Sequence, residues 1–459
     1  MYIIGTIIAI QFIALTAYCL YKKYNPQGVL LIMGLLMMAV GLLMRLYTIS
    51  LAEPTGSVVF DLFKTVRETF SANVARVGLM IMTIGGYVGY MKHIKASDTL
   101  VYVSMQPLSL FKRHSYLAAC IIIPIGQVLF ITTPSATGLG LLLAASIFPV
   151  LVNLGVSRLT AASVICACTV FDMGPGSANT AKAAEVVDMN NVFYFVEYQL
   201  HVTIPMTILL MIFYYFSSRY FDKKDQQKER SGGEKTVIEE NFKVDTPLIY
   251  AMLPVLPLVL LIVFSKYVQI FNPPIELDTT TAMFVSLMVA MLFETVRTRS
   301  LKNVFAGLRA FWEGMGKMFT NVITLIVSAE IFSKGLICLG FIESLVQGST
   351  HIGLSGVFIG ILITILIFLA AMLMGSGNAS FFSFGPLIPG IATQLGLEPA
   401  RIILPMQLSS SMGRATSPIA GVIVAIAEVA GVSPMSLAKR NLIPLAGVLL
   451  VMLVYNYIF

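Results

Sequence analysis

Charged side chains are scarce in this sequence. Only 12% of its 459 residues are charged, whereas 57% are hydrophobic. An ordinary soluble domain carries roughly 25% charged residues, so the composition argues against a water-soluble fold. The basic residues behind the net charge of +7 stand mostly singly between hydrophobic runs. We therefore expect them to set the orientation of a membrane protein, and we expect no nucleic-acid partner.

Cysteine and long polar stretches are also sparse. The five cysteines are scattered through apolar segments without the spacing of metal ligands, which predicts buried thiols and no disulfide framework. Only one long polar stretch interrupts the hydrophobic sequence, at residues 217–246, where acidic and basic side chains balance. We interpret this stretch as a solvated cytoplasmic linker between two halves of the chain.

Long hydrophobic runs make up most of the remaining sequence. A helix needs about 20 apolar residues to cross a bilayer, so the chain predicts an all-α polytopic membrane protein with about ten transmembrane helices. The first run lacks a basic flank and a small-residue cleavage site, so we expect it to be retained as a span. The uninterrupted spans predicted are 2–22, 28–48, 76–92, 192–216, 247–265, 277–296, 318–335 and 436–458.

Four further hydrophobic segments are interrupted by small residues. Residues 115–155 and 353–395 are broken at their middle, and we predict two re-entrant hairpins there. Two broken helices are predicted over 158–190 and 399–431. Residues 49–75 carry charges among apolar residues at helical spacing, which predicts an interfacial helix. With both termini outside, most Lys and Arg residues fall on the cytoplasmic side, as the positive-inside rule requires.

The two halves of the chain resemble each other. A shift of about 241 residues (374 minus 133) lays TPSATGLG at 133–140 over MGSGNASF at 374–381, so Ser135 meets Ser376 and Thr137 meets Asn378. Because an odd number of crossings separates matching points, the repeats are predicted to be inverted, as in many secondary transporters. We assign residues 1–216 to the first repeat and 247–459 to the second.

The four breaks carry the predicted chemistry. They read TPSATG at 133, MGPGSANT at 173, MGSGNAS at 374 and GRATSP at 413. Unwound backbone survives in hydrocarbon only when it is buried in protein or lines a wet cavity, so we predict one shared polar cavity. Helix amino termini at the breaks favour anions. The predicted substrate-binding residues are Ser135, Thr137, Ser177, Asn179, Ser376, Asn378, Arg414, Thr416 and Ser417.

Each hydroxyl taken alone is better explained by a bond to its own helix backbone or by close packing, whereas the four breaks taken together favour a binding site. A coupling cation is expected, with a sodium site near Ser135, Thr137 and Asn378 as one option. No other cofactor is expected.

Several ionisable residues lie within hydrophobic segments, where they are costly. Arg414 has three interpretations: a bidentate substrate contact, a structural ion pair, or a side chain that reaches toward the cytoplasm. Asp172 is interpreted either as a cation ligand or as a partner of Lys182. Glu330 and Lys334 have the spacing of an intrahelical pair. Glu185 and Glu428, which the repeat relates, receive no transport role.

The breaks also resemble a known family. The segments SATGLGLLLAASIFPVLVNLGVSR, GSGNASFFSF and SSSMGRATSPIAGVIVA look like signatures of the anaerobic C4-dicarboxylate carriers of the DcuC type, in the ion transporter superfamily. The resemblance runs over most of the chain and includes GYMKHI at 89–94. It implies a homodimer in the bacterial inner membrane, with a scaffold and a mobile part that works by an elevator motion.

The same resemblance implies succinate, fumarate or malate as substrate, moved outward or exchanged under anaerobic conditions. Superfamily relatives carry a Ser-Asn-Thr motif at each hairpin tip. Here the tips read Ser135-Ala136-Thr137 and Ser376-Gly377-Asn378, so the middle residue brings no polar side chain. These altered tips leave sodium and proton coupling both open.

Two alternatives to this function remain. One is a transporter of another small organic anion in the same superfamily. The other is an intramembrane serine hydrolase, because Ser177 follows Gly-Pro-Gly and His201 lies on the next span. The hydrolase is disfavoured because the Ser177 and His201 pair has no counterpart in the other half, whereas the breaks do. The chain is therefore not expected to be an enzyme.

Overall fold

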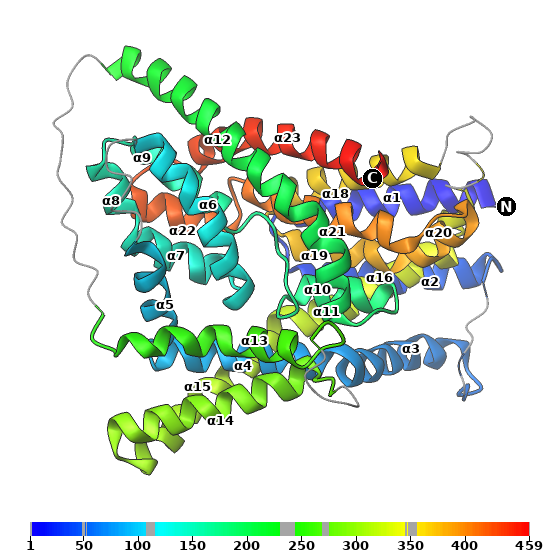
Figure 1. Cartoon of the computed structure of the whole chain (residues 1–459). Helices are drawn as coiled ribbons and strands as arrows, with labels where there is room; N and C mark the ends of the chain where they lie inside the picture. Colours follow the sequence, from blue (N-terminus) through cyan, green and yellow to red (C-terminus); the bar gives the residue numbers. More distant parts are fainter. Residues whose placement is uncertain are drawn as a thin grey trace.

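A computed structural model describes residues 2–47, 51, 53–106, 115–229, 244–268, 275–344, 347 and 356–458. Every regular element within these ranges is a helix (Figure 1). Residues 230–243 of the predicted linker and the first residues of the second predicted hairpin, at 353–355, lie outside the described residues. The same holds for residue 48 of the predicted span at 28–48 and for residues 49–50 and 52 of the predicted interfacial segment.

The elements follow one another along the chain as α-helices, with three π-helical and two 3-10 segments. They are α1 (Tyr2–Tyr21), α2 (Pro26–Leu43), α3 (Val58–Asn73), η1 (Val74–Gly78), α4 (Leu79–His93), α5 (Ala96–Met105), α6 (Ser115–Thr132), α7 (Ala136–Ser146), α8 (Phe148–Asn153), α9 (Arg158–Ala167), α10 (Ala178–Val186), α11 (Asn191–Tyr194), η3 (Phe195–Gln199), α12 (Leu200–Glu229), η4 (Leu248–Val255), α13 (Leu256–Val263), α14 (Thr279–Thr298), α15 (Leu301–Met318), η5 (Phe319–Ile323), α16 (Thr324–Cys338), α18 (Gly356–Met374), α19 (Gly377–Phe384), η6 (Gly385–Leu387), α20 (Ile388–Leu395), α21 (Pro399–Ala415), α22 (Gly421–Ala430) and α23 (Pro434–Ile458).

Nine helices among the described residues are long and apolar enough to cross a membrane, which confirms an all-helical polytopic protein. Two of them, Ser115–Thr132 and Gly356–Met374, are the first arms of the segments predicted as hairpins. The remaining seven are Ile4–Tyr21, Pro26–Leu43, Val58–His93, Asn191–Lys224, Thr279–Thr298, Leu301–Cys338 and Pro434–Ile458.

The predicted interfacial helix at 49–75 and the predicted span at 76–92 were drawn wrongly. The structure forms one continuous helix of 36 residues, Val58–His93, and a second one of 38 residues, Leu301–Cys338, where the span was predicted to begin at 318. At 1.5 Å per residue each is over 50 Å long, well beyond a hydrocarbon core of about 30 Å. The hydropathy pattern placed the start of each span at the point where the sequence becomes mostly apolar. In the structure, each helix begins earlier and includes the more polar residues before that point.

The predicted span at 247–265 has an unexpected backbone. Its first part, η4, is a 3-10 helix that contains Pro254, and α13 follows with Pro257 near its start. Proline removes a backbone donor and disturbs the regular α-helical ladder. Eight residues at about 2.0 Å and eight at about 1.5 Å still give a length of about 28 Å, close to the hydrocarbon thickness.

The helices pack so that the interrupted ones meet in the centre. The long helices form close neighbours in pairs, with α16 along α2 and α15 along α4. The interrupted elements pack together as α18 with α21 and α7 with α22. In Figure 1, α3, α4, α14 and α15 lie along the lower side, whereas α6 to α9 and α22 gather at one end of the upper part. The elements that flank the third break, α18 and α19, lie together with α21 to one side of this second group.

Candidate functional site

All four predicted breaks are unwound in the structure. The chain leaves helical geometry at 133–135, 168–177, 375–376 and 416–420. Gly174 and Gly375 have φ angles of 99° and 70°, which other residues rarely adopt, so glycine is required at these two breaks. At Gly375 a Cβ atom would also lie only 2.9 Å from a side-chain carbon of Ile419 in the fourth break. The third and fourth breaks are therefore in direct contact.

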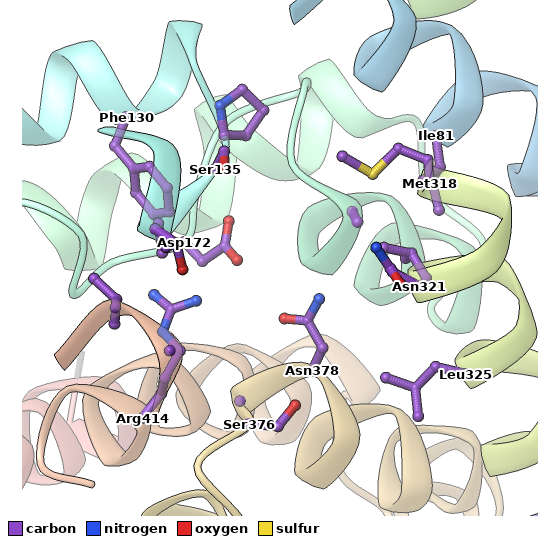
Figure 2. A pocket seen from close by; sticks show the side chains of 18 of the residues that line it. Ile81, Phe130, Ser135, Asp172, Met318, Asn321, Leu325, Ser376, Asn378 and Arg414 are labelled. Carbon is purple, nitrogen blue, oxygen red and sulfur yellow. The ribbon is translucent and has the colours of Figure 1, made fainter. Parts of the chain in front are cut away.

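Residues from all four breaks line one cavity of about 370 Å³ (Figure 2). This volume falls within the range of about 300 to 1,000 Å³ that small-molecule sites occupy. One wall comes from the breaks and the other from the long helices, through Ile81 and Ile84 on one and Met318, Asn321 and Leu325 on the other. The cavity therefore lies between the interrupted helices and the two long continuous ones.

Ser135 and Ser376 cap the two helices that start at the cavity. The Ser135 Oγ atom accepts a hydrogen bond from the Gly138 backbone N–H of α7, and Ser376 Oγ accepts one from Ala379 of α19, each at 3.2 Å. The predicted alternative of a hydroxyl bonded to its own helix backbone is thus present. Each hydroxyl hydrogen is not used by the cap, so it can still donate to an anion. Neither helix has an acidic residue in its first turn.

Thr137 and Asn378, which the internal repeat relates, both line the cavity. Thr137 Oγ1 lies 3.6 Å from the position that a Cβ atom of Gly421 would occupy, which brings the first break against the start of α22. Gly377 fits closely on the Ser410 backbone of α21, because a Cβ atom there would lie 2.8 Å from the carbonyl oxygen. Gly377 and Gly421, which lack side chains, thus allow the backbone beside each break to lie close to the neighbouring element.

Arg414 and Asp172 are the two ionisable residues among those that line the cavity. Figure 2 shows the Arg414 guanidinium and the Asp172 carboxylate facing each other at the cavity edge. Arg414 Nη2 donates a hydrogen bond to the Thr169 carbonyl oxygen at 2.7 Å, and its buried Nε has no hydrogen-bond partner within the described part of the chain. Arg414 therefore points into the site and does not reach toward a membrane surface.

Asp172 does not pair with Lys182, so that interpretation was wrong. Its carboxylate accepts hydrogen bonds from the Ser177 hydroxyl at 2.6 Å and from Asn179 Nδ2 at 2.9 Å. Lys182 instead pairs with Glu185 at 2.7 Å and with Glu330 at 3.4 Å. The α10 helix turns Lys182 away from its own amino terminus and toward α16.

Four predicted binding residues lie behind the cavity wall. Ser177 and Asn179 are fully buried and hold Asp172, and the Ser177 hydroxyl also accepts from backbone N–H groups of α10. Thr416 donates to the Gly413 carbonyl oxygen of its own helix, as the structural alternative predicted. Ser417 is fully buried and does not line the cavity. The cavity lining includes the other five: Ser135, Thr137, Ser376, Asn378 and Arg414.

Asn321 is a lining residue that the sequence did not suggest. It lies in the π-helical turn η5, in the middle of the Leu301–Cys338 helix. π-helical turns frequently occur at functional sites, but a single extra residue in a turn leaves little trace in hydropathy. Asn321 has no counterpart in the repeat pattern that identified the breaks.

The charged groups near α10 form a separate cluster. Glu330 accepts a hydrogen bond from Asn73 at 2.8 Å and pairs with Lys334 at 3.5 Å, so the predicted intrahelical pair is present within a larger network. Glu185 also lies 3.7 Å from Arg76. Glu428 is exposed, so the two glutamates that the repeat relates do not have matching surroundings.

The geometry does not support a hydrolase. His201 is exposed, whereas Ser177 is buried and its hydroxyl donates to Asp172. A serine nucleophile needs a base within hydrogen-bonding reach and access to a substrate carbonyl. Ser177 instead contacts Asp172, and its buried position gives a substrate carbonyl no access to the hydroxyl.

Comparison with known proteins identifies the family of this chain. Residues 4–458 match the family model described as the C4-dicarboxylate anaerobic carrier DcuC. The chain is 32% identical over 456 residues to the anaerobic C4-dicarboxylate transporter DcuC of Escherichia coli strain K12, covering 98% of this chain and 95% of that one. The probable anaerobic C4-dicarboxylate transporter DcuC of Vibrio cholerae is also 32% identical, over 93% of this chain and 92% of its own.

A solved structure has a similar fold. MtrF of Neisseria gonorrhoeae superimposes with a TM-score of 0.66 over 96% of this chain and 97% of its own, at 12% sequence identity. At that identity the likeness concerns the fold alone. The family match spans nearly the whole chain, and it assigns the chain to carriers and not to enzymes. The chain belongs to the DcuC family of anaerobic C4-dicarboxylate carriers.

Proposed function

We propose that this protein is a secondary active transporter of C4-dicarboxylates in the bacterial inner membrane, with succinate, fumarate and malate as its substrates. The observation that carries the proposal is the cavity of about 370 Å³ into which four helix breaks open. Such a site provides backbone N–H groups and hydroxyls at bilayer depth, where a small anion needs them. The C4-dicarboxylate carrier family to which the chain belongs supports the substrate class.

A dicarboxylate has two charged ends, and the cavity offers an anion-binding feature on two sides. Ser135 caps α7 on one side, and Ser376 caps α19 on the other. Helix amino termini attract anions through unpaired N–H groups and the helix dipole. We assign one substrate carboxylate to the Ser135 and Thr137 end. The other belongs at the Ser376 and Asn378 end, within reach of Arg414.

The charge of the cavity argues for a coupling cation. Asp172 and Arg414 contribute one charge of each sign, so a bound dianion would leave a net charge of about minus two. Moving uncompensated charge through the bilayer costs at least a few kcal/mol. Sodium ions or protons entering with the substrate would offset it. Oxygens of Ser135, Thr137 and Asn378 offer ligands for sodium, whereas Asp172 offers a proton acceptor.

The order of elements supports two inverted repeats. The series α6, α7, α9 and α10 recurs as α18, α19, α21 and α22, with a break at the same place in each. The two long helices with a central π-helical turn, α3 to α4 and α15 to α16, occupy matching places before these series. We propose that the series form the mobile part of an elevator and that the long helices belong to a scaffold, in a homodimer.

Both ends of the chain lie toward the same side of the molecule in Figure 1. We propose that this is the outer side, because the basic residues between spans then face the cytoplasm. Efflux or exchange of succinate under anaerobic conditions is the proposed direction of transport in the cell.

Counterflow of radiolabelled succinate in proteoliposomes tests the function. We expect internal unlabelled succinate, fumarate or malate to drive uptake of label, with sodium and pH varied independently to identify the coupling ion. Counterflow driven by another class of organic anion, but by none of the three dicarboxylates, would contradict the proposed substrate.

A further inference from the structure

The unwound segment at 168–177 is held by side chains from other helices. Its first residues, 168–170, still donate to carbonyl oxygens at the end of α9, but the backbone beyond them leaves helical geometry, and buried backbone groups there need other partners. Arg414 donates to the Thr169 carbonyl oxygen at 2.7 Å. Gln407 Nε2 donates to the Asp172 carbonyl oxygen at 2.9 Å, and Gln199 Oε1 accepts from the Gly174 N–H at 3.0 Å. Three backbone groups of the segment are thus satisfied from outside.

Two of these side chains come from one face of α21. Gln407 and Arg414 are seven residues apart, which is two helical turns, or about 10.5 Å along the axis. They contact carbonyl oxygens that are three residues apart in the unwound segment, at Thr169 and Asp172. The segment is therefore stretched along α21, and this regular helix sets its position.

The two glutamines also bind each other. Gln199 Nε2 donates to Gln407 Oε1 at 3.1 Å and to Thr180 Oγ1 at 3.0 Å. Tyr194 OH donates to the same Gln407 oxygen at 3.1 Å. Gln199, Gln407 and Thr180 are all 0% exposed, so their hydrogen bonds do not compete with bulk water. Buried amides that use both ends in this way fix each other's orientation.

The backbone around Gln199 supports a specific role. Gln199 ends the π-helical turn η3, and the helix continues from there as α12. A π-helical turn inserts one residue and is commonly retained where a side chain must be aimed at a functional site. Gly174, whose N–H donates to Gln199, has a φ of 99°. Gln199 therefore binds the backbone at a position whose conformation favours glycine.

We infer that Gln407 and Gln199 are positioning residues for the substrate cavity. They hold the backbone of the unwound segment, while Ser177 and Asn179 hold the Asp172 carboxylate. The position of that carboxylate relative to Arg414 depends on both attachments. This inference rests on the proposed function, because it concerns the site that binds the dicarboxylate.

Substitutions of Gln407 test the positioning role. In Gln407→Met the donor to Asp172 is lost together with the acceptor for Gln199 and Tyr194, and we expect the KM for succinate to rise about tenfold or more, since three buried hydrogen bonds are removed. Gln407→Glu keeps the shape and the acceptor for Tyr194, yet has no donor when ionised. It should show the same rise at neutral pH, with partial recovery at lower pH relative to wild type, because a protonated carboxyl can donate again.

Gln127→Met is the matched control. Gln127 is also buried, on α6, where it accepts a hydrogen bond from Thr207, and among the described residues no hydrogen bond joins its side chain to the unwound segment. We expect its KM to stay near the wild-type value. A Gln407→Met protein with wild-type KM, or a Gln127→Met protein with the same rise, would overturn the positioning role.

Hydrogen exchange provides a readout that needs no substrate. In Gln407→Met and Gln199→Met, peptides covering 168–177 should exchange backbone hydrogens faster than in wild type and in Gln127→Met, with the surrounding helices unchanged. Unchanged exchange in this segment would overturn the inference that Gln407 and Gln199 hold its backbone. Wild-type protein without dicarboxylate counterflow would instead overturn the proposed function, so the two failures are distinguishable.

Discussion

The Ser177 hydroxyl donates a 2.6 Å hydrogen bond to the Asp172 carboxylate, five residues earlier in the chain. Asn179 donates to the second carboxylate oxygen at 2.9 Å. The amino terminus of α10 is therefore occupied by a carboxylate of the protein itself. The first turns of α7 and α19 contain no acidic residue, and the amino termini of both helices line the cavity. This difference divides the breaks into one that binds a protein carboxylate and others that remain available to a substrate.

Replacement of Asp172 by Asn should separate exchange from coupled transport. The amide keeps a similar shape but cannot take up a proton or carry a negative charge to a cation. We expect counterflow of succinate to persist, whereas accumulation driven by a sodium or proton gradient should be lost. Both rates are measured in the same proteoliposomes. Asp188→Asn, at an exposed position, is the control, and wild-type accumulation by Asp172→Asn would contradict a coupling role.

Replacement of Arg414 by Lys should weaken substrate binding. Lysine keeps the charge but cannot form two parallel hydrogen bonds to a carboxylate, and it cannot reproduce the contact to Thr169 in the same pose. We expect the dissociation constant for succinate to rise about tenfold or more, equivalent to about 1.4 kcal/mol. Arg309→Lys, in an exposed ion pair, should bind as wild type does. Equal affinities for both variants would leave Arg414 with a structural role only.

Removal of the capping hydroxyls should affect stability and binding differently. Ser135→Ala, Ser376→Ala and Ser300→Ala each remove a helix cap, which costs about 1 kcal/mol of stability. Only the first two serines line the cavity, so only these two variants should also raise the KM for succinate. Transport kinetics and thermal unfolding in detergent measure both effects. A similar KM for all three variants would show that the hydroxyls at the cavity serve only as caps.

Replacement of Lys182 by Met should destabilise the protein. The Lys182 side chain is 3% exposed and its ammonium group pairs with both Glu185 and Glu330, so its removal leaves two partly buried carboxylates without their shared cation. Breaking a buried ion pair in this way costs about 3 to 5 kcal/mol. The double variant Lys182→Met with Glu330→Gln should recover part of the loss in thermal unfolding. Arg309→Met, at an exposed pair, should cost less than about 1 kcal/mol.

The sequence alone predicted the four unwound segments and most of the spans. Gly, Pro and Ser residues inside apolar runs are local signals, because they change the backbone wherever they stand. The starts of the two longest helices were placed wrongly, since hydropathy follows the local polarity of a helix and not its length. The shared cavity was also predicted from the sequence, because unwound backbone is costly in hydrocarbon unless it lines a polar cavity.

Which polar residues face the cavity depended on tertiary structure. Ser135 and Ser177 are both serines that cap a helix at a break, yet Ser135 lines the cavity and Ser177 lies behind it. Asn321, Gln199 and Gln407 had no signal in the sequence. Gln199 and Gln407 meet only because η3 and α21, which are far apart along the chain, pack together. Local composition determines where the backbone unwinds and what crosses the membrane. The packing of distant helices decides which side chains an anion can reach, because one helical turn separates a lining position from a buried one.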